Sequence, residues 1–299
     1  MAWTIATLSN EVSQHSPLGV TVGEREVALF RDADGICRAV EDRCAHRRAP
    51  LAAGKVTADG LIECPYHGWR YEGAGGACKA IPNLSRSERV PGSYRIAAYP
   101  CAESAGFVWI GDHPDDAETA PGDEALALFA KRAVREGGRL IAYPAVQYRE
   151  ALLNAPSAVL FVAGHQIIDN HRLGEPEFSE RHVEVAYAVD LRRRRDRETP
   201  ALATADFPYS LEVRSVGQLD RVILRGPDDE IAASMLLAAV PVADSLCRVV
   251  WRADDRDKAG VDMMLRDTLD AGALLNASKA AAPVALPKSA ISILKEEMA

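Results

Sequence analysis

Two short stretches of the chain each place one cysteine beside one histidine. The first, DRCAHRRAPL at 42–51, holds Cys44 and His46, and the second, ECPYHGWRY at 63–71, holds Cys64 and His67. The short spacing within each pair lets one tight loop direct both side chains to a common point. Two thiolates and two imidazoles can hold either a tetrahedral zinc ion or a [2Fe–2S] cluster with mixed ligands.

The order of the ligands separates these two possibilities. Zinc fingers usually pair like with like, a Cys-x₂₋₄-Cys loop facing a His-x₃₋₅-His turn. Here each loop carries one ligand of each kind. That arrangement favours a cluster in which one iron takes both cysteines and the other takes both histidines, with zinc as the alternative.

The two loops resemble those of a known family. CAHRRAPLAAGKV and CPYHGWRY are similar to the cluster loops of a Rieske [2Fe–2S] domain of the Rieske non-haem iron oxygenases, which hydroxylate rings or demethylate. Respiratory Rieske proteins add a disulfide between one further cysteine in each loop. This chain has Arg47, Arg48 and Tyr66 in those regions, so the resemblance implies the oxygenase type, which receives electrons from a reductase or ferredoxin.

The elements around the loops predict two domains in an α+β chain. Short β-prone runs separated by turns fill the first hundred residues, including a hairpin around Asp-Ala-Asp-Gly at 32–35. The acidic, Pro- and Gly-containing stretch 112–124 is typical of a linker. We therefore expect an all-β Rieske domain at 1–115 and, by resemblance, a helix-grip-like oxygenase domain at 116–299.

Within the second domain the apolar pattern predicts both helices and strands. We expect helix in 124–136 and over 148–166, the latter interrupted at Pro156, and again across the alanine-rich segment 257–299. Strands are expected at 182–191, 208–216, 220–225, 232–241 and 246–252.

The resemblance implies a second iron that this chain is not equipped to hold. In the family, a mononuclear iron is bound by two histidines and a carboxylate, with open positions for O₂ and substrate. The histidines follow a bridging aspartate in the pattern Asp-x-x-His-x₄-His. In this chain Asn154, Ser157 and Val162 occupy these three positions. Serine is a poor ligand for Fe(II) and valine is none, so we expect the mononuclear Fe(II) to be absent from this chain.

Two other sets of residues could replace the missing ligands. His165, Asp169 and His171 form a trio of two imidazoles and a carboxylate, of which His165 and Asp169 would share a face if the segment were helical. A late acidic ligand is expected at Asp257, with Asp254 or Asp255 as alternatives.

Composition limits the class of protein. A net charge of −8 argues against nucleic-acid binding, and no apolar run reaches the length of about 20 residues that a membrane helix needs. The first residues lack the pattern of a signal peptide, so a cytoplasmic protein is expected. Of the six cysteines, the three in strand-like apolar context are expected to be small buried hydrophobes: Cys37, Cys101 and Cys247.

Three functions are compatible with these observations. The first is an oxygenase-type electron relay in a trimer, homomeric or mixed, that passes electrons to a related subunit carrying the catalytic iron. The second is a self-sufficient oxygenase using His165, Asp169 and His171. The third is a non-enzymatic Rieske electron carrier with an additional interaction domain.

Overall fold

The computed structural model describes residues 3–85, 88–111, 135–163, 165–179, 182–193, 208–254, 263–271, 273–274 and 284–286. The chain divides into two compact units, Met1–Lys131 and Arg132–Ala299. The expected boundary at 115 and the expected linker at 112–124 lie outside the described residues, as does most of the helix expected at 124–136. Among the described residues, no helix is long and apolar enough to cross a membrane.

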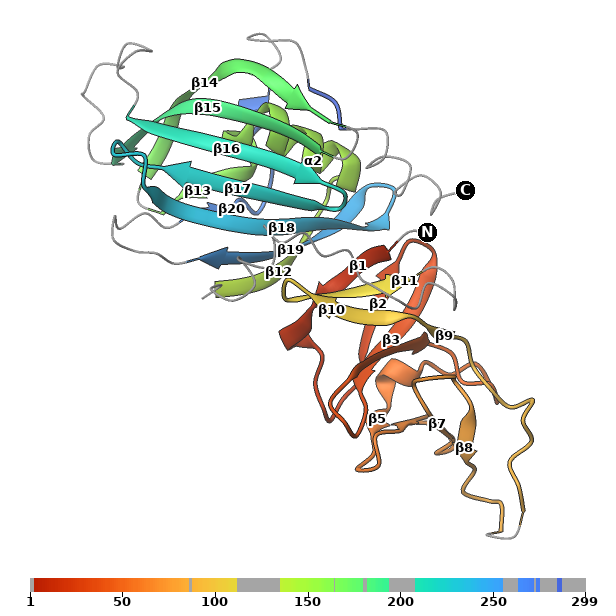
Figure 1. Cartoon of the computed structure of the whole chain (residues 1–299). Helices are drawn as coiled ribbons and strands as arrows, with labels where there is room; N and C mark the ends of the chain where they lie inside the picture. The colour runs from red at the N-terminus through yellow and green to blue at the C-terminus, as the bar shows by residue number, and fades with distance from the viewer. Residues whose placement is uncertain are drawn as a thin grey trace. The chain divides into compact units, whose positions relative to one another are not determined.

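The first unit is built from short antiparallel strands (Figure 1). Its described strands form three small sheets, ordered β1-β11-β10, β2-β3-β4-β9 and β5-β6-β7-β8. The strands are β1 (Trp3–Leu8), β2 (Leu18–Val22), β3 (Arg25–Arg31), β4 (Cys37–Glu41), β5 (Lys55–Val56), β6 (Ile62–Glu63), β7 (Arg70–Tyr71), β8 (Cys78–Ala80), β9 (Ala98–Tyr99), β10 (Cys101–Ser104) and β11 (Phe107–Gly111). Two 3-10 turns, η1 (Ser9–Glu11) and η2 (Leu51–Ala53), complete it.

The predicted hairpin between β3 and β4 is confirmed. The Gly35 N–H donates to the Asp32 carbonyl at 3.0 Å, and Gly35 has a φ of 77°, which a side chain would disfavour. Inward side chains of β3 and β4 contribute to two apolar cores, one of which also contains Cys44 and Cys64. The sheets therefore place both cysteine loops against a buried face.

The second unit is dominated by one antiparallel sheet. Its described strands run in the order β12-β19-β18-β17-β16-β15-β14, and a separate pair is formed by β13 and β20. The elements are β12 (Arg135–Ile141), α2 (Ala145–Asn154), α3 (Pro156–Val159), β13 (Leu160–Val162), β14 (His165–Phe178), β15 (His182–Arg193), β16 (Tyr209–Val216), β17 (Leu219–Arg225), β18 (Ile231–Ala243), β19 (Leu246–Asp254) and β20 (Met263–Leu265). The five strands expected between 182 and 252 are confirmed, and the whole has the expected α+β class.

Two of the expected helices are wrong in part. The helix expected over 148–166 begins earlier, at Ala145, breaks before Pro156 and gives way to strand at Leu160. Proline cannot donate the helical hydrogen bond, and the β-branched and aromatic run that follows suits a strand. In the segment expected to be helical from 257, Met263–Leu265 is the strand β20, paired with β13.

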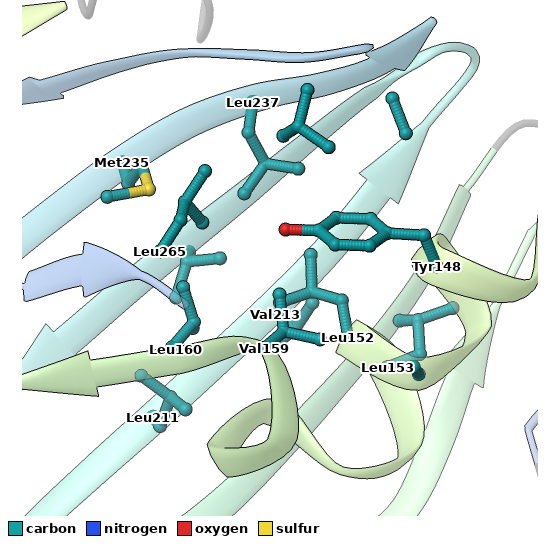
Figure 2. Packing of buried hydrophobic residues seen from close by; sticks show 14 of the residues in the cluster. Tyr148, Leu152, Leu153, Val159, Leu160, Leu211, Val213, Met235, Leu237 and Leu265 are labelled. Carbon is teal, nitrogen blue, oxygen red and sulfur yellow. The ribbon is translucent and has the colours of Figure 1, made fainter. Parts of the chain in front are cut away.

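Helices α2 and α3 cover the sheet through an apolar core. Figure 2 shows Tyr148, Leu152 and Val159 from these helices beside Val213 of β16 and Leu237 of β18. These side chains are almost completely buried, so their packing fixes the C-terminal end of α2 relative to the sheet.

A buried ion pair joins α2 to the same sheet. Arg149 of α2 and Asp220 of β17 have side chains 1% and 0% exposed, and the Arg149 Nε donates to both carboxylate oxygens at 3.1 and 2.9 Å. The Arg149 Nη2 adds a bond of 2.9 Å to Oδ1, and the Ser215 hydroxyl donates to the same oxygen. The carboxylate thus has the several donors that a buried charge requires.

We predict that Arg149→Ala destabilises the second unit by about 3–5 kcal/mol, because it leaves the Asp220 carboxylate buried without its countercharge. Urea unfolding followed by circular dichroism measures the loss. The matched control is Arg43→Ala, which removes the exposed pair with Glu26 and should leave the midpoint nearly unchanged. Equal midpoints for the two variants would contradict the structural role of the buried pair.

Candidate metal centre

The first cysteine loop follows β4 and is closed by two backbone hydrogen bonds. The Cys44 N–H donates to the Ala49 carbonyl at 2.9 Å, and the Arg48 N–H donates to the Cys44 carbonyl at 2.8 Å. Arg48 has a φ of 57°, a left-handed conformation that costs a non-glycine residue about 1–2 kcal/mol. Its guanidinium is paired with Glu41 at 2.7 Å. The pair with Glu41 thus helps to hold Arg48 in this unfavourable backbone conformation.

The second cysteine loop joins β6 to β7 and repeats the same pattern. The Cys64 N–H donates to the Trp69 carbonyl at 2.8 Å, and the Gly68 N–H donates to the Cys64 carbonyl at 3.1 Å. Gly68 takes the left-handed position with a φ of 68°, and a Cβ there would lie 3.0 Å from the Pro82 Cγ. In both loops the bonds connect the cysteine to the fourth and fifth residues after it, so the two loops present their cysteines in the same way.

The four candidate ligands divide into a buried pair and an exposed pair. Cys44 and Cys64 are 1% and 2% exposed and pack in one apolar core. His46 and His67 are exposed, and their ring centroids lie 4.7 Å apart. The loops therefore bring together sulfur below the surface and nitrogen at it.

The electrostatics of the pairs agree with this division. Burial raises the pKa of the Cys64 thiol, and the backbone N–H groups of Tyr66 and His67, which donate to the sulfur, act in the opposite direction. Desolvation lowers the pKa of His46, and the positive charges of His67 and Arg47 lower it further. A neutral imidazole is the form that binds a metal.

Aromatic side chains hold the two imidazoles. The His46 ring stacks on Trp69 with centroids 4.8 Å apart and planes 3° from parallel, and Tyr66 contacts the His67 ring at 4.0 Å. Trp69 in turn contacts Tyr94 at 5.1 Å. These contacts restrict the orientation of both rings.

Tyr71 is a site residue that the sequence did not reveal. It is fully buried on β7, its hydroxyl lies 3.1 Å from the Cys44 Sγ, and it accepts a bond of 3.2 Å from the Ala45 N–H. Burial raises the pKa of Tyr71, so its hydroxyl stays protonated. The hydroxyl can therefore donate a hydrogen bond to a thiolate at Cys44. The sequence showed that Tyr71 lies two residues after Trp69 in the second loop motif. It did not show which face of β7 the Tyr71 side chain occupies.

The donor set fits a [2Fe–2S] cluster. One iron would take the two buried thiolates of Cys44 and Cys64, and the other the two exposed imidazoles of His46 and His67. A single zinc ion would need all four side chains at one point. Here the buried thiols and the exposed imidazoles form two separate pairs, the arrangement that suits two irons.

The position expected for the bridging aspartate has a different task. Asn154 ends α2, and its side-chain amide donates to the Val284 carbonyl and accepts from the Val284 N–H, at 2.8 and 2.7 Å. The same amide donates to the Glu150 carbonyl at 2.8 Å. Val284 and Leu286 are buried, so Asn154 fastens a distant segment of the chain to the end of the helix.

The residues at the two positions expected for iron histidines, Ser157 and Val162, are buried and have structural contacts. Ser157 is buried in α3, and its carbonyl accepts a bond of 2.8 Å from the Arg266 Nε. Val162 is buried on β13, paired with Met263 of β20. The helical spacing that would bring two ligands to one face is absent here, because Val162 lies on a strand. These residues do not fit a mononuclear iron.

The alternative trio lies on a strand and not on a helix. His165, Asp169 and His171 belong to β14, so the helix that would give His165 and Asp169 a shared face is not formed. At about 3.3 Å per residue, six steps of strand separate His165 from His171 by roughly 20 Å. That separation argues against one iron between them, although the Asp169 side chain lies outside the described residues. The His165 Nδ1 contacts the Ala163 carbonyl at 3.0 Å.

The candidate late carboxylates are only partly described. Asp254 is the last residue of β19, opposite Ser234. Asp255 and Asp257 lie outside the described residues, so Asp257 as a ligand stays a prediction.

Comparison with known proteins places the first unit. The model of the Rieske [2Fe-2S] domain matches residues 2–100. The oxygenase component of dicamba O-demethylase from Stenotrophomonas maltophilia is 37% identical over 126 residues, 42% of this chain and 33% of that protein. Protein TIC 55 from Arabidopsis thaliana is 39% identical over 127 residues, 42% of this chain and 23% of that protein. The matched region thus spans a third or less of these relatives.

Solved structures extend the likeness to the fold of the whole chain. Dicamba monooxygenase bound to dicamba has a TM-score of 0.67 and 19% identity, covering 99% of this chain and 95% of that one. NdmA of Pseudomonas putida CBB5 with caffeine has a TM-score of 0.61 and 17% identity, covering 99% and 89%. At these identities the likeness concerns the fold alone.

We predict that Tyr71→Phe lowers the reduction potential of the cluster by roughly tens of millivolts. In the wild type, the hydrogen bond from Tyr71 stabilises the reduced cluster, which carries more negative charge. Losing about 1 kcal/mol of that stabilisation corresponds to about 40 mV for one electron. Redox titration followed by absorption measures the shift. Tyr94→Phe, which alters a half-exposed ring near Trp69, is the control and should leave the potential unchanged. An unchanged potential in Tyr71→Phe would show that this bond does not tune the cluster.

We predict that Asn154→Asp releases the segment 284–286. The isosteric carboxylate cannot donate to the Val284 and Glu150 carbonyls and repels both, which costs about 1–3 kcal/mol. Amide hydrogen exchange of the segment should accelerate roughly ten- to a hundredfold by that energy. Asn83→Asp, at an exposed turn, is the control. Unchanged exchange would mean that the amide does not hold the segment.

Proposed function

Because residues 2–100 form a Rieske [2Fe–2S] domain and the chain has the fold of the Rieske non-haem iron oxygenases, we propose that it is the electron-relay subunit of such an oxygenase. It receives electrons from a reductase or ferredoxin and passes them towards O₂-dependent hydroxylation or demethylation. A related subunit carries the catalytic iron. The proposal is carried by one combination of residues. The chain has two Cys/His pairs suited to the cluster, but Asn154, Ser157 and Val162 at the positions where the resemblance implies the second iron's ligands.

The bound cluster supplies one-electron transfer. The protein's own residues decide where that transfer takes place. Cys44 and Cys64 lie under the surface with Tyr71 as hydrogen-bond donor, whereas His46 and His67 are exposed. An electron therefore reaches a partner most directly through the imidazole side, and the buried side is shielded from solvent.

The exposed side also carries features suited to a partner. Tyr66 and Tyr94 are 60% and 42% exposed around the imidazoles, and aromatic rings are enriched in protein interfaces. Arg47 is exposed beside His46 and adds positive charge at this face. An acidic electron donor or a related subunit docks there, in the trimeric or mixed assembly that the family resemblance implies.

The closed second-iron position favours a partner over a self-sufficient enzyme. Asn154 engages Val284 through both amide atoms, Ser157 is buried, and Val162 is apolar. His165 and His171 are spread along β14. Relatives described as an O-demethylase and a 4beta-methylsterol monooxygenase support an oxygenase setting over a free-standing electron carrier. The expected cytoplasmic location stays a prediction.

We predict that the purified protein contains two irons per chain, gives the electron paramagnetic resonance signal of a reduced Rieske cluster, and shows no O₂-dependent turnover alone. Turnover should appear when a related subunit with an intact iron site and an electron donor are added. Cys64→Ser is the matched variant: it removes a cluster ligand and should abolish turnover in the reconstituted assembly.

The outcomes separate the three functions. A third tightly bound iron with turnover by the isolated chain would establish a self-sufficient oxygenase. Full-rate electron transfer to a simple acceptor, with no stimulation of any oxygenase subunit, would establish a carrier.

A further inference from the structure

Two cysteines outside the cluster lie in contact in the first unit. Cys37 is the first residue of β4 and is buried, and Cys101 is the first residue of β10 and is partly buried. Strands β4 and β10 pack against each other, and both cysteines belong to one apolar core, Cys37 within it and Cys101 at its edge. Cys247 is also buried and packs in the core of the second unit.

The strand register explains why these thiols meet. β4 pairs with β9 so that Ala39 faces Tyr99 and Val40 faces Ala98, and the Glu41 N–H donates to the Ala97 carbonyl at 2.9 Å. After Tyr99 the chain enters β10, which pairs with β11 but also packs against β4. Extrapolating the β4–β9 register by two residues brings Cys101 level with Cys37. Hydrogen-bonded pairs in such a ladder have Cα atoms about 5.5 Å apart. That lies within the range of about 4.4–6.8 Å that a disulfide requires.

The segment between the two cysteines contains the whole candidate centre. Residues 37–101 include Cys44, His46, Cys64 and His67. A covalent bond between the ends of this segment would close both ligand loops into one ring. Closing so long a loop restricts the unfolded chain and so favours the folded domain.

We propose that Cys37 and Cys101 are a redox modification site that forms a cross-strand disulfide under a peroxide-class oxidant. One thiolate attacks hydrogen peroxide to give a sulfenic acid and hydroxide, and the second thiol displaces water from it. The sum is two thiols plus H₂O₂ giving one disulfide plus two H₂O. A dithiol reductant such as dithiothreitol reverses the bond by exchange. This inference does not depend on the proposed electron-relay function.

The charges near the pair set the expected rate. The hydrogen bond from Cys37 and burial raise the pKa of Cys101, and Glu103 acts in the same direction, whereas Arg38 opposes it. Arg31, which faces Cys37 across the ladder, is held by Glu103 at 2.7 Å. Since the thiolate is the reactive form, oxidation is expected to be slow at neutral pH.

The test uses the full-length protein with its cluster in place. The holoprotein is treated with a small excess of hydrogen peroxide over hours, its cluster absorbance is checked, and free thiols are then alkylated in denaturant. Digestion with trypsin yields peptides 32–38 and 96–131, which carry Cys37 and Cys101. We expect these two peptides to be recovered as one disulfide-linked species that dithiothreitol separates.

A second measurement tests the consequence for the centre. The oxidised protein should lose its cluster absorbance several-fold more slowly in urea than the reduced protein. Cys101→Ser should form no linked peptide and show no difference between the two treatments, whereas Cys247→Ala should behave as the wild type. The comparison of oxidised and reduced wild-type protein stands even where a variant folds poorly.

Two results would overturn the proposal. One is complete alkylation of both Cys37 and Cys101 after peroxide treatment with the cluster intact. The other is a linked peptide that joins either cysteine to a different partner.

Discussion

The first unit depends on keeping two thiols below the surface and two imidazoles at it. Each loop meets this requirement with one backbone turn, closed by bonds from the cysteine to its fourth and fifth successors. The turn needs a left-handed residue, supplied by Gly68 in one loop and by Arg48, held by Glu41, in the other. Both loops have the same backbone geometry, so Cys44 and Cys64 take the same position in their loops. The surrounding strands bury both side chains.

In the second unit a difference of one functional group decides what the end of α2 binds. A carboxylate at 154 could accept hydrogen bonds and contact a metal site, but it could not donate to a carbonyl. The Asn154 amide does both, and so it matches the N–H and carbonyl of one backbone residue, Val284. Once that segment is fastened there, and Val162 lies on a strand, the position favours packing over metal binding.

Sequence could predict what is local and could not predict what depends on distant pairing. The cluster ligands were recognisable because each pair lies within four residues. The strands of the second sheet followed from alternation, and Pro156 marked the helix break, but the strand after it was missed because an apolar run fits either element. The contact of Asn154 with Val284 spans 130 residues. Cys37 and Cys101 were expected to be simple buried hydrophobes because their meeting depends on the register of β4 and β9.

The candidate cluster ligands and the Asn154 contact lie in different units of the chain. The four candidate ligands all belong to the first unit, whereas the Arg149–Asp220 pair and the Asn154–Val284 contact stabilise a second unit that has serine at 157 and valine at 162. In the proposed relay, an electron held between the buried thiolates and the exposed imidazoles passes to a partner chain. Trp69, Tyr66 and Tyr94 frame His46 and His67, so these aromatic side chains shape the surface around the imidazoles at which such a partner would dock.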